Sequence, residues 1–105
     1  MRAVAFTELG QERPFDLVIN ATSASLTGDA PAVPVASFAS GGLAYEMVYG
    51  KGLTPFLRLA RAADAVRLAD GAGMLVEQAA IAFAWWRGVA PDTAAVIAKL
   101  AAPLT

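Results

Sequence analysis

The chain has 105 residues, of which 57% are hydrophobic and 16% are charged, so it is expected to fold as one small domain. It contains neither cysteine nor histidine, which excludes a disulfide framework, a Cys/His zinc site and imidazole acid–base chemistry. The formal net charge is -1 and no basic run occurs, which argues against an electrostatic interface with nucleic acid.

The first residues show no basic segment followed by an apolar run, so the sequence predicts no secretory signal. The longest apolar stretch, 73–86, contains Glu77 and Gln78 and is shorter than the roughly 20 residues that a membrane span needs. We therefore expect a cytoplasmic protein that does not cross a membrane. Its high apolar content also predicts a surface covered by a partner domain or a second copy.

Short apolar runs predict four strands, at 2–6, 16–20, 43–49 and 65–68. The run at 16–20 reads D-L-V-I-N, and its continuous apolar centre is typical of a parallel strand covered on both faces. The run at 43–49 follows two glycines and is closed by two more. Polar residues with glycine and proline between the first three runs predict turns, a short helix and loop.

Three helices are expected after these strands. Thr54 and Pro55 have the residue types of an N-cap and a first helical position, for a helix to about residue 63. Asp70 is predicted to cap a second helix over about 71–86, and Asp92 a last one to about residue 101. The second helix is apolar almost all round, which predicts that both its sides are covered. This order of elements predicts an α/β fold with a mostly parallel sheet and C-terminal helices.

Four segments, in this order and rough spacing, resemble the C-terminal half of the shikimate dehydrogenase family. They are D-L-V-I-N-A-T-S at 16–23, Y-E-M-V-Y at 45–49, K-G-L-T-P-F-L at 51–57 and D-G-A-G-M-L-V-E-Q-A-A at 70–80. The resemblance implies that 1–105 is the C-terminal part of a Rossmann-like, dinucleotide-binding domain. It also implies an NADP-dependent oxidoreductase that reduces 3-dehydroshikimate to shikimate in aromatic amino-acid biosynthesis.

Polar residues follow the strand at 16–20, where ligands of open α/β sheets collect. The resemblance implies that Ala21, Thr22 and Ser23 lie near the ribose and adenine side of the cofactor. The residue types alone favour an ordinary polar exit from a strand.

Tyr45, Met47 and Tyr49 are expected on one face of a strand, because side chains alternate along it. The resemblance implies that Met47 contacts the nicotinamide end and that the Tyr49 hydroxyl reaches substrate, whereas the residue types alone favour plain core packing. Glu46 stands where the family commonly has aspartate, and Gly50-Lys51 where many members have Asn-Pro.

Gly71, Met74 and Gln78 are spaced to share one face of a helix. A buried, unpaired Gln78 amide would cost about 1–3 kcal/mol, so a ligand hydroxyl or a backbone group is needed as its partner. The resemblance implies that the Gly71 backbone meets the nicotinamide amide, that Met74 packs on the ring, and that Gln78 binds substrate.

The family's catalytic lysine and aspartate and its glycine-rich phosphate turn match no position here, so no catalytic residue is assigned. The isolated chain, without an N-terminal substrate domain, is therefore predicted to be inactive. In the doubly wound strand order, 2–6 would lose its neighbour, so it is expected to move onto the open edge of 16–20 or onto a second copy. The partner is then a second copy at that edge or an N-terminal domain.

Two alternatives stay open at this point. One is a non-catalytic, self-associating or binding module. The other is half of a split quinate/shikimate dehydrogenase, with the choice between NADP and NAD undecided because the selecting residues belong to a strand outside this sequence.

Overall fold

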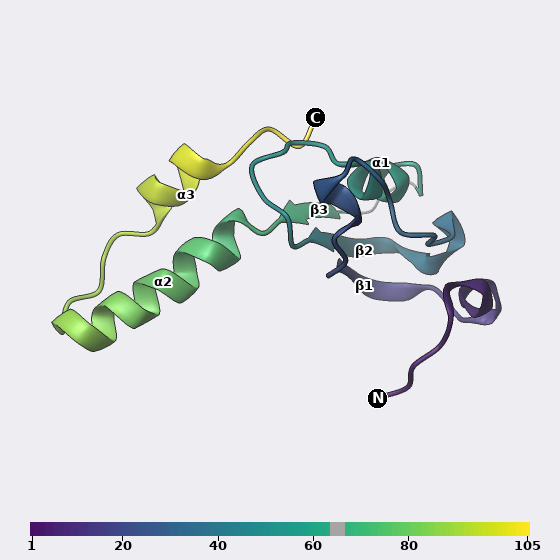
Figure 1. Cartoon of the computed structure of the whole chain (residues 1–105), viewed down its shortest axis with the longest axis horizontal. Coiled ribbons are helices and arrows are strands. Elements are labelled where there is room, and N and C mark those ends of the chain that lie inside the picture. Colours follow the sequence, from purple (N-terminus) through teal and green to yellow (C-terminus); the bar gives the residue numbers. More distant parts are fainter. Residues whose placement is uncertain (64–66) are drawn as a thin grey trace.

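A computed structural model of the chain describes residues 1–63 and 67–105. Within them, three parallel strands form one sheet in the order β1-β2-β3: β1 (Phe15–Asn20), β2 (Phe38–Glu46) and β3 (Arg67–Asp70). Asn20 pairs with Glu46 and Glu46 with Asp70, so the last residues of all three strands lie in one row. The predicted α/β class with a parallel sheet is confirmed (Figure 1).

The helices begin and end close to their predicted positions. They are α1 (Pro55–Arg61), α2 (Ala72–Arg87) and α3 (Ala94–Leu100). Thr54 is the N-cap of α1, and its hydroxyl accepts a hydrogen bond from the Leu57 amide at 3.3 Å. The Asp70 carboxylate accepts one from the Ala72 amide at 3.1 Å, although Gly71 occupies the N-cap position of α2. Gly88, with a φ of 70°, ends α2 in the left-handed conformation typical of a glycine there.

The predicted strand at 2–6 is wrong. Residues 1–5 lie outside the sheet, and the chain then forms the short 3-10 helix η1 (Phe6–Gln11), which Arg2 and Glu12 flank as an ion pair. The segment therefore does not move onto the edge of β1 in the single chain. A run of five residues with no neighbouring strand lacks partners for its backbone groups, so water and local turns satisfy them instead.

The other boundary differences are smaller. β2 starts at Phe38 and ends at Glu46, so Met47 and Tyr49 lie beyond the strand. Two further 3-10 turns, η2 (Ala24–Leu26) and η3 (Val35–Ser37), interrupt the expected loop before it. The first two residues of the predicted strand at 65–68 lie outside the described ranges, and β3 runs on to Asp70.

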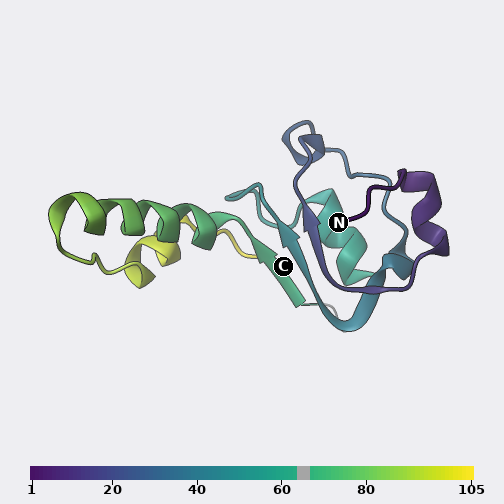
Figure 2. The ribbon, with the colours of Figure 1, turned by 90° about the horizontal axis from the view of Figure 1, so that it is seen from below.

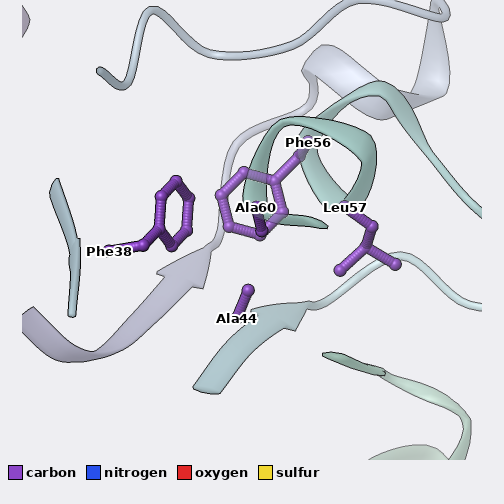
Figure 3. Close-up of a cluster of buried hydrophobic side chains, with 5 residues drawn as sticks. All are labelled: Phe38, Ala44, Phe56, Leu57 and Ala60. Atoms are coloured by element: carbon purple, nitrogen blue, oxygen red, sulfur yellow. The ribbon is translucent and has the colours of Figure 1, made fainter. Parts of the chain in front are cut away.

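The hydrophobic core lies between one face of the sheet and α1. Phe56, Leu57 and Ala60 of α1 are fully buried against β2, where the rings of Phe38 and Phe56 have centroids 5.9 Å apart. Figure 3 shows these side chains converging from the two elements. Burial of these α1 side chains against β2 holds both ends of the segment 47–54 that connects the two elements.

Among the described residues, the opposite face of β1 and much of α2 are exposed. Leu17 and Ile19 of β1 are 51% and 53% exposed, and Trp85 and Trp86 of α2 are 88% and 78% exposed. The helix extends away from the sheet with α3 beside it (Figures 1 and 2). The radius of gyration is accordingly 15.6 Å, against about 13 Å for a compact domain of this length. The described part of the chain supplies no second cover for β1 or α2, so the predicted cover would have to come from a partner domain or a second copy.

Candidate functional site

A groove of ≈ 470 Å³ opens at the carboxyl ends of β1 and β2. One side, the β1-side wall, consists of Ala21, Thr22 and Leu26. The other, the β2-side wall, consists of Met47, Val48, Tyr49 and Lys51. The carboxyl edge of an open parallel sheet is where ligands of such folds bind, so this groove is the candidate site.

Four of the predicted site residues line this groove together: Ala21, Thr22, Met47 and Tyr49. Ser23 follows Thr22 in the same exposed loop but is not among the lining residues. Tyr45, predicted on the same strand face as Met47 and Tyr49, also does not line it, because β2 ends at Glu46 and the chain turns there. The turn, rather than strand alternation, brings Met47 and Tyr49 to one wall.

Gly71 lies against the backbone of this wall. A Cβ added to it would lie 2.9 Å from the carbonyl carbon of Met47 and closer still to its oxygen. β2 and β3 are neighbours whose last residues pair, so the residues that follow them, Met47 and Gly71, are forced together. Only glycine leaves room for this approach, which joins the start of α2 to the groove.

Met74 and Gln78 lie further along α2 and do not line the groove. Met74 is 44% exposed, and Gln78 is exposed as well. The Gln78 amide donates to the carbonyl of Leu75 in its own helix at 2.8 Å, so its predicted burial is wrong. That local bond uses one of the two amide hydrogens, and water can satisfy the other polar atoms of an exposed side chain without any burial cost.

A buried polar cluster behind the groove was missed from the sequence. Glu46 is fully buried, and its carboxylate accepts hydrogen bonds from the side chains of Asn20, Ser25 and Thr54. These three donors are themselves buried, with exposed fractions of 2%, 3% and 3%. One signal was available: Glu46 is two residues from the buried Ala44, and alternation along a strand puts both on the core face.

A second cavity, of ≈ 370 Å³, lies between α2 and α3. Its lining is mostly apolar and includes Val76, Phe83, Val96 and Leu100. None of the predicted site residues reaches it. Among the described residues, no group of three acidic side chains is placed to hold a metal ion. No helix in this part of the chain combines the length and the apolar character that crossing a bilayer requires.

Comparison with known proteins links this arrangement to one group of enzymes. Residues 71–101 match the family described as "Shikimate 5'-dehydrogenase C-terminal domain". The shikimate dehydrogenase (NADP(+)) of Dechloromonas aromatica (strain RCB) is 63% identical over 92 residues, which are 88% of this chain and 34% of that protein. The chain thus spans about a third of the length of this relative.

Solved structures agree with the sequence comparison. An Ael1 enzyme from Pseudomonas putida superposes with a TM-score of 0.84 at 61% identity, over 95% of this chain and 36% of that one. The shikimate 5-dehydrogenase of Thermus thermophilus, solved in complex with NADP(H) and shikimate, gives a TM-score of 0.76 at 32% identity, over 95% and 37% of the two chains.

Proposed function

We infer that this chain, a homologue of the C-terminal portion of the shikimate dehydrogenases, supplies the cofactor side of an NADP-dependent enzyme that reduces 3-dehydroshikimate to shikimate. The observation that carries this proposal is the groove at the strand ends. Residues of the motif segments at 16–23 and 45–49 lie on its two walls, and Gly71 of another motif lies against the backbone of Met47 on one of them. We also propose the cytoplasm as its compartment, since a chain without cysteine needs no oxidising surroundings.

The groove and the residues beside it are proposed to contact both halves of a dinucleotide. Ala21, Thr22 and Ser23 are proposed to contact the ribose and adenine side, where small side chains and hydroxyls can approach sugar oxygens. Met47 and Met74 are proposed to pack against the nicotinamide ring, since a thioether makes favourable contacts with aromatic rings. The Gly71 backbone, which has no side chain in the way, is proposed to meet the nicotinamide amide.

Tyr49 and Gln78 are the proposed substrate contacts. The Tyr49 side chain is 46% exposed at the groove, so its hydroxyl is free to donate to a ring substituent of the substrate. The Gln78 side chain is exposed on α2 and keeps an oxygen and a second amide hydrogen for a ligand. When bound, NADPH would supply the hydride, and these side chains would hold the ketone carbon of the substrate in reach of it.

The 105 residues alone are proposed to be inactive, because the catalytic lysine and aspartate expected from the resemblance have no counterpart among them. We propose that the chain works with an N-terminal domain that provides both groups and the glycine-rich phosphate turn. The test is a hybrid protein that joins the N-terminal portion of the Dechloromonas aromatica relative to this chain. We expect NADP(+)-dependent oxidation of shikimate by the hybrid and none by the chain alone.

Two tyrosines make the test specific to the groove. In the hybrid, Tyr49→Phe should lower kcat/KM for shikimate by roughly threefold to tenfold, the effect of one lost hydrogen bond. Tyr45→Phe is the matched control and should leave kcat/KM unchanged, because Tyr45 does not line the groove. A folded hybrid without activity, or equal effects of the two substitutions, would count against the proposed function.

A specific observation favours a second candidate, self-association of the isolated chain through β1. β1 is an edge strand of the sheet, and its face bearing Leu17 and Ile19 is exposed. Unpaired edge strands with apolar side chains pair readily with other chains. In this case light scattering of the 105-residue chain should give the mass of a dimer.

The position of such an interface can be tested with two lysines. Leu17→Lys in β1 should return the chain to a monomer, whereas Ile81→Lys on α2 should not, although Ile81 is also exposed, at 67%. A dimer that persists in the Leu17 variant and disappears in the Ile81 variant would place the contact on α2 and exclude the β1 edge.

A further inference from the structure

Glu46 closes β2 with a carboxylate to which only hydrogen-bond donors are directed. Asn20 Nδ2 lies 3.1 Å from each oxygen, and the hydroxyls of Ser25 and Thr54 lie 2.6 and 2.9 Å from Oε2. The Val48 amide is a longer contact, at 3.5 Å from Oε1. In residues 1–63 and 67–105, no lysine or arginine forms an ion pair with it. Neutral donors therefore provide all the compensation that a fully buried carboxylate needs.

The three donors belong to the segments that build the two walls of the groove. Asn20 ends β1 just before the β1-side wall, and its own Oδ1 accepts from the Thr22 amide and hydroxyl at 3.1 and 2.7 Å. Ser25 lies in η2, next to Leu26 of the same wall. Thr54 ends the turn that carries the β2-side wall and caps α1.

The cluster therefore ties together both walls and the helix that follows them, while none of its four members lines the groove. The Glu46 carboxylate adds side-chain hydrogen bonds to the backbone link between β1's exit loop and the turn after β2, in which the Met47 amide donates to the Asn20 carbonyl at 3.1 Å. The position of Thr22 is linked to Glu46 through Asn20, which bonds to both residues. The positions of Met47 and Tyr49 are linked to Glu46 because their segment starts at Glu46 and ends at Thr54, which donates to Glu46. Asn20 Nδ2 also donates to Ser25 Oγ at 3.4 Å, but both residues belong to the β1 side, so removing the acceptor would break the side-chain link between that side and Thr54.

We propose that Glu46 is a positioning residue for the groove: it holds the cofactor and substrate walls at their working distance without touching either ligand. This inference rests on the proposed function. The reason is geometric, since reacting groups misplaced by about 1 Å can cost roughly a hundredfold in rate. The proposal distinguishes Glu46 from residues that only add stability, because its loss should affect catalysis by molecules that are still folded.

The decisive variant is Glu46→Gln in the hybrid protein. An amide keeps the size of the side chain but directs N–H groups at donors, so the walls should separate and kcat/KM for shikimate should fall at least tenfold. Glu46→Asp keeps the acceptor but shortens the side chain, and should recover part of that loss. Phe38→Ala is the control for stability, since Phe38 is a core residue at the opposite end of β2. Measured well below its unfolding temperature, this control should change kcat/KM less than twofold.

Hydrogen exchange in the 105-residue chain gives a second readout that needs no activity. The amides of Thr22 and Leu57 bond to Asn20 and Thr54 at the two ends of the cluster. In Glu46→Gln both should exchange at least tenfold faster relative to Val18 in the ladder of β1 and β2. In Phe38→Ala the three amides should accelerate together.

The outcomes separate this inference from the proposed function. If the hybrid that contains the unsubstituted chain is inactive, the proposed function is contradicted. The hydrogen-exchange experiment would then decide the role of Glu46. The inference is overturned if Glu46→Gln lowers kcat/KM no more than Phe38→Ala does, or if Thr22 and Leu57 exchange at their original rates relative to Val18. If the Gln variant does not fold, Ser25→Ala replaces it, since that change removes one donor from the β1-side wall and leaves the carboxylate paired with the other two.

Discussion

Replacing Gly71 with alanine should lower the unfolding temperature of the chain by on the order of 10–20 °C. The added Cβ meets the backbone of Met47, which is fixed in place by the end of β2, so the strain cannot be relieved by moving a flexible side chain. Overpacking typically costs about 1–3 kcal/mol, and a clash with backbone belongs at the upper end of that range. The φ of Gly71 is −76°, which alanine adopts freely, so the effect is purely one of space.

The same substitution should reduce the activity of the hybrid protein at least tenfold, because Met47 on the β2-side wall must shift to admit the methyl group. Thermal unfolding followed by circular dichroism measures the first effect, and steady-state kinetics with shikimate measures the second. Gly73→Ala provides the matched control two residues later. Apart from its chain neighbours and the backbone of its own helix, no atom of the described residues lies within 4 Å of its added Cβ, so it should leave activity unchanged and add up to about 1 kcal/mol of stability. Equal behaviour of the two variants would disprove the close approach of Gly71 and Met47.

Phe56→Ala should destabilise the chain by about 3–5 kcal/mol, the cost of emptying a large buried site. Phe56 is completely buried between α1 and the sheet, where its ring contacts that of Phe38. A domain of this size commonly has only about 5–15 kcal/mol of total stability, so much of the reserve would be lost. The free energy of unfolding in urea is the appropriate measurement.

Phe6→Ala is the control for this second prediction. Phe6 begins η1 and is 48% exposed, so its loss should cost less than about 1 kcal/mol. If removing Phe6 were as damaging as removing Phe56, the burial of Phe56 in the cluster of Figure 3 would not explain the loss of stability.

Local signals explain why much of the architecture was predictable. The pair Thr54-Pro55 marks a helix start because a hydroxyl satisfies a free amide and proline lacks one, and the observed cap bond has this form. The D-L-V-I-N run forms β1 within one residue of its predicted bounds. Both features depend on residues only a few positions apart, so no knowledge of the rest of the fold was needed.

Two predictions that depended on distant partners were wrong. The segment 2–6 has the composition of a strand but no neighbour to pair with, and it stays outside the sheet. Gln78 was expected to be buried because its helix is apolar, yet nothing in the described part of this chain covers that side of α2, and the amide bonds to its own backbone. A run of apolar residues indicates that burial of their side chains would be favourable, but it does not indicate which element buries them.

The sequence by itself determined most of the helices and strands and the parallel α/β class, because capping, turn and hydrophobic patterns act over short distances. The four residues that meet at one groove, Ala21, Thr22, Met47 and Tyr49, were predicted from the family resemblance and not from these local patterns. Only the tertiary structure decided that the Gly71 backbone leaves no room for a side chain beside Met47 and that Glu46 gathers Asn20, Ser25 and Thr54. The physical reason is strand pairing: alignment of β1, β2 and β3 brings together residues 26 positions apart, such as Asn20 and Glu46, and no local pattern records that register.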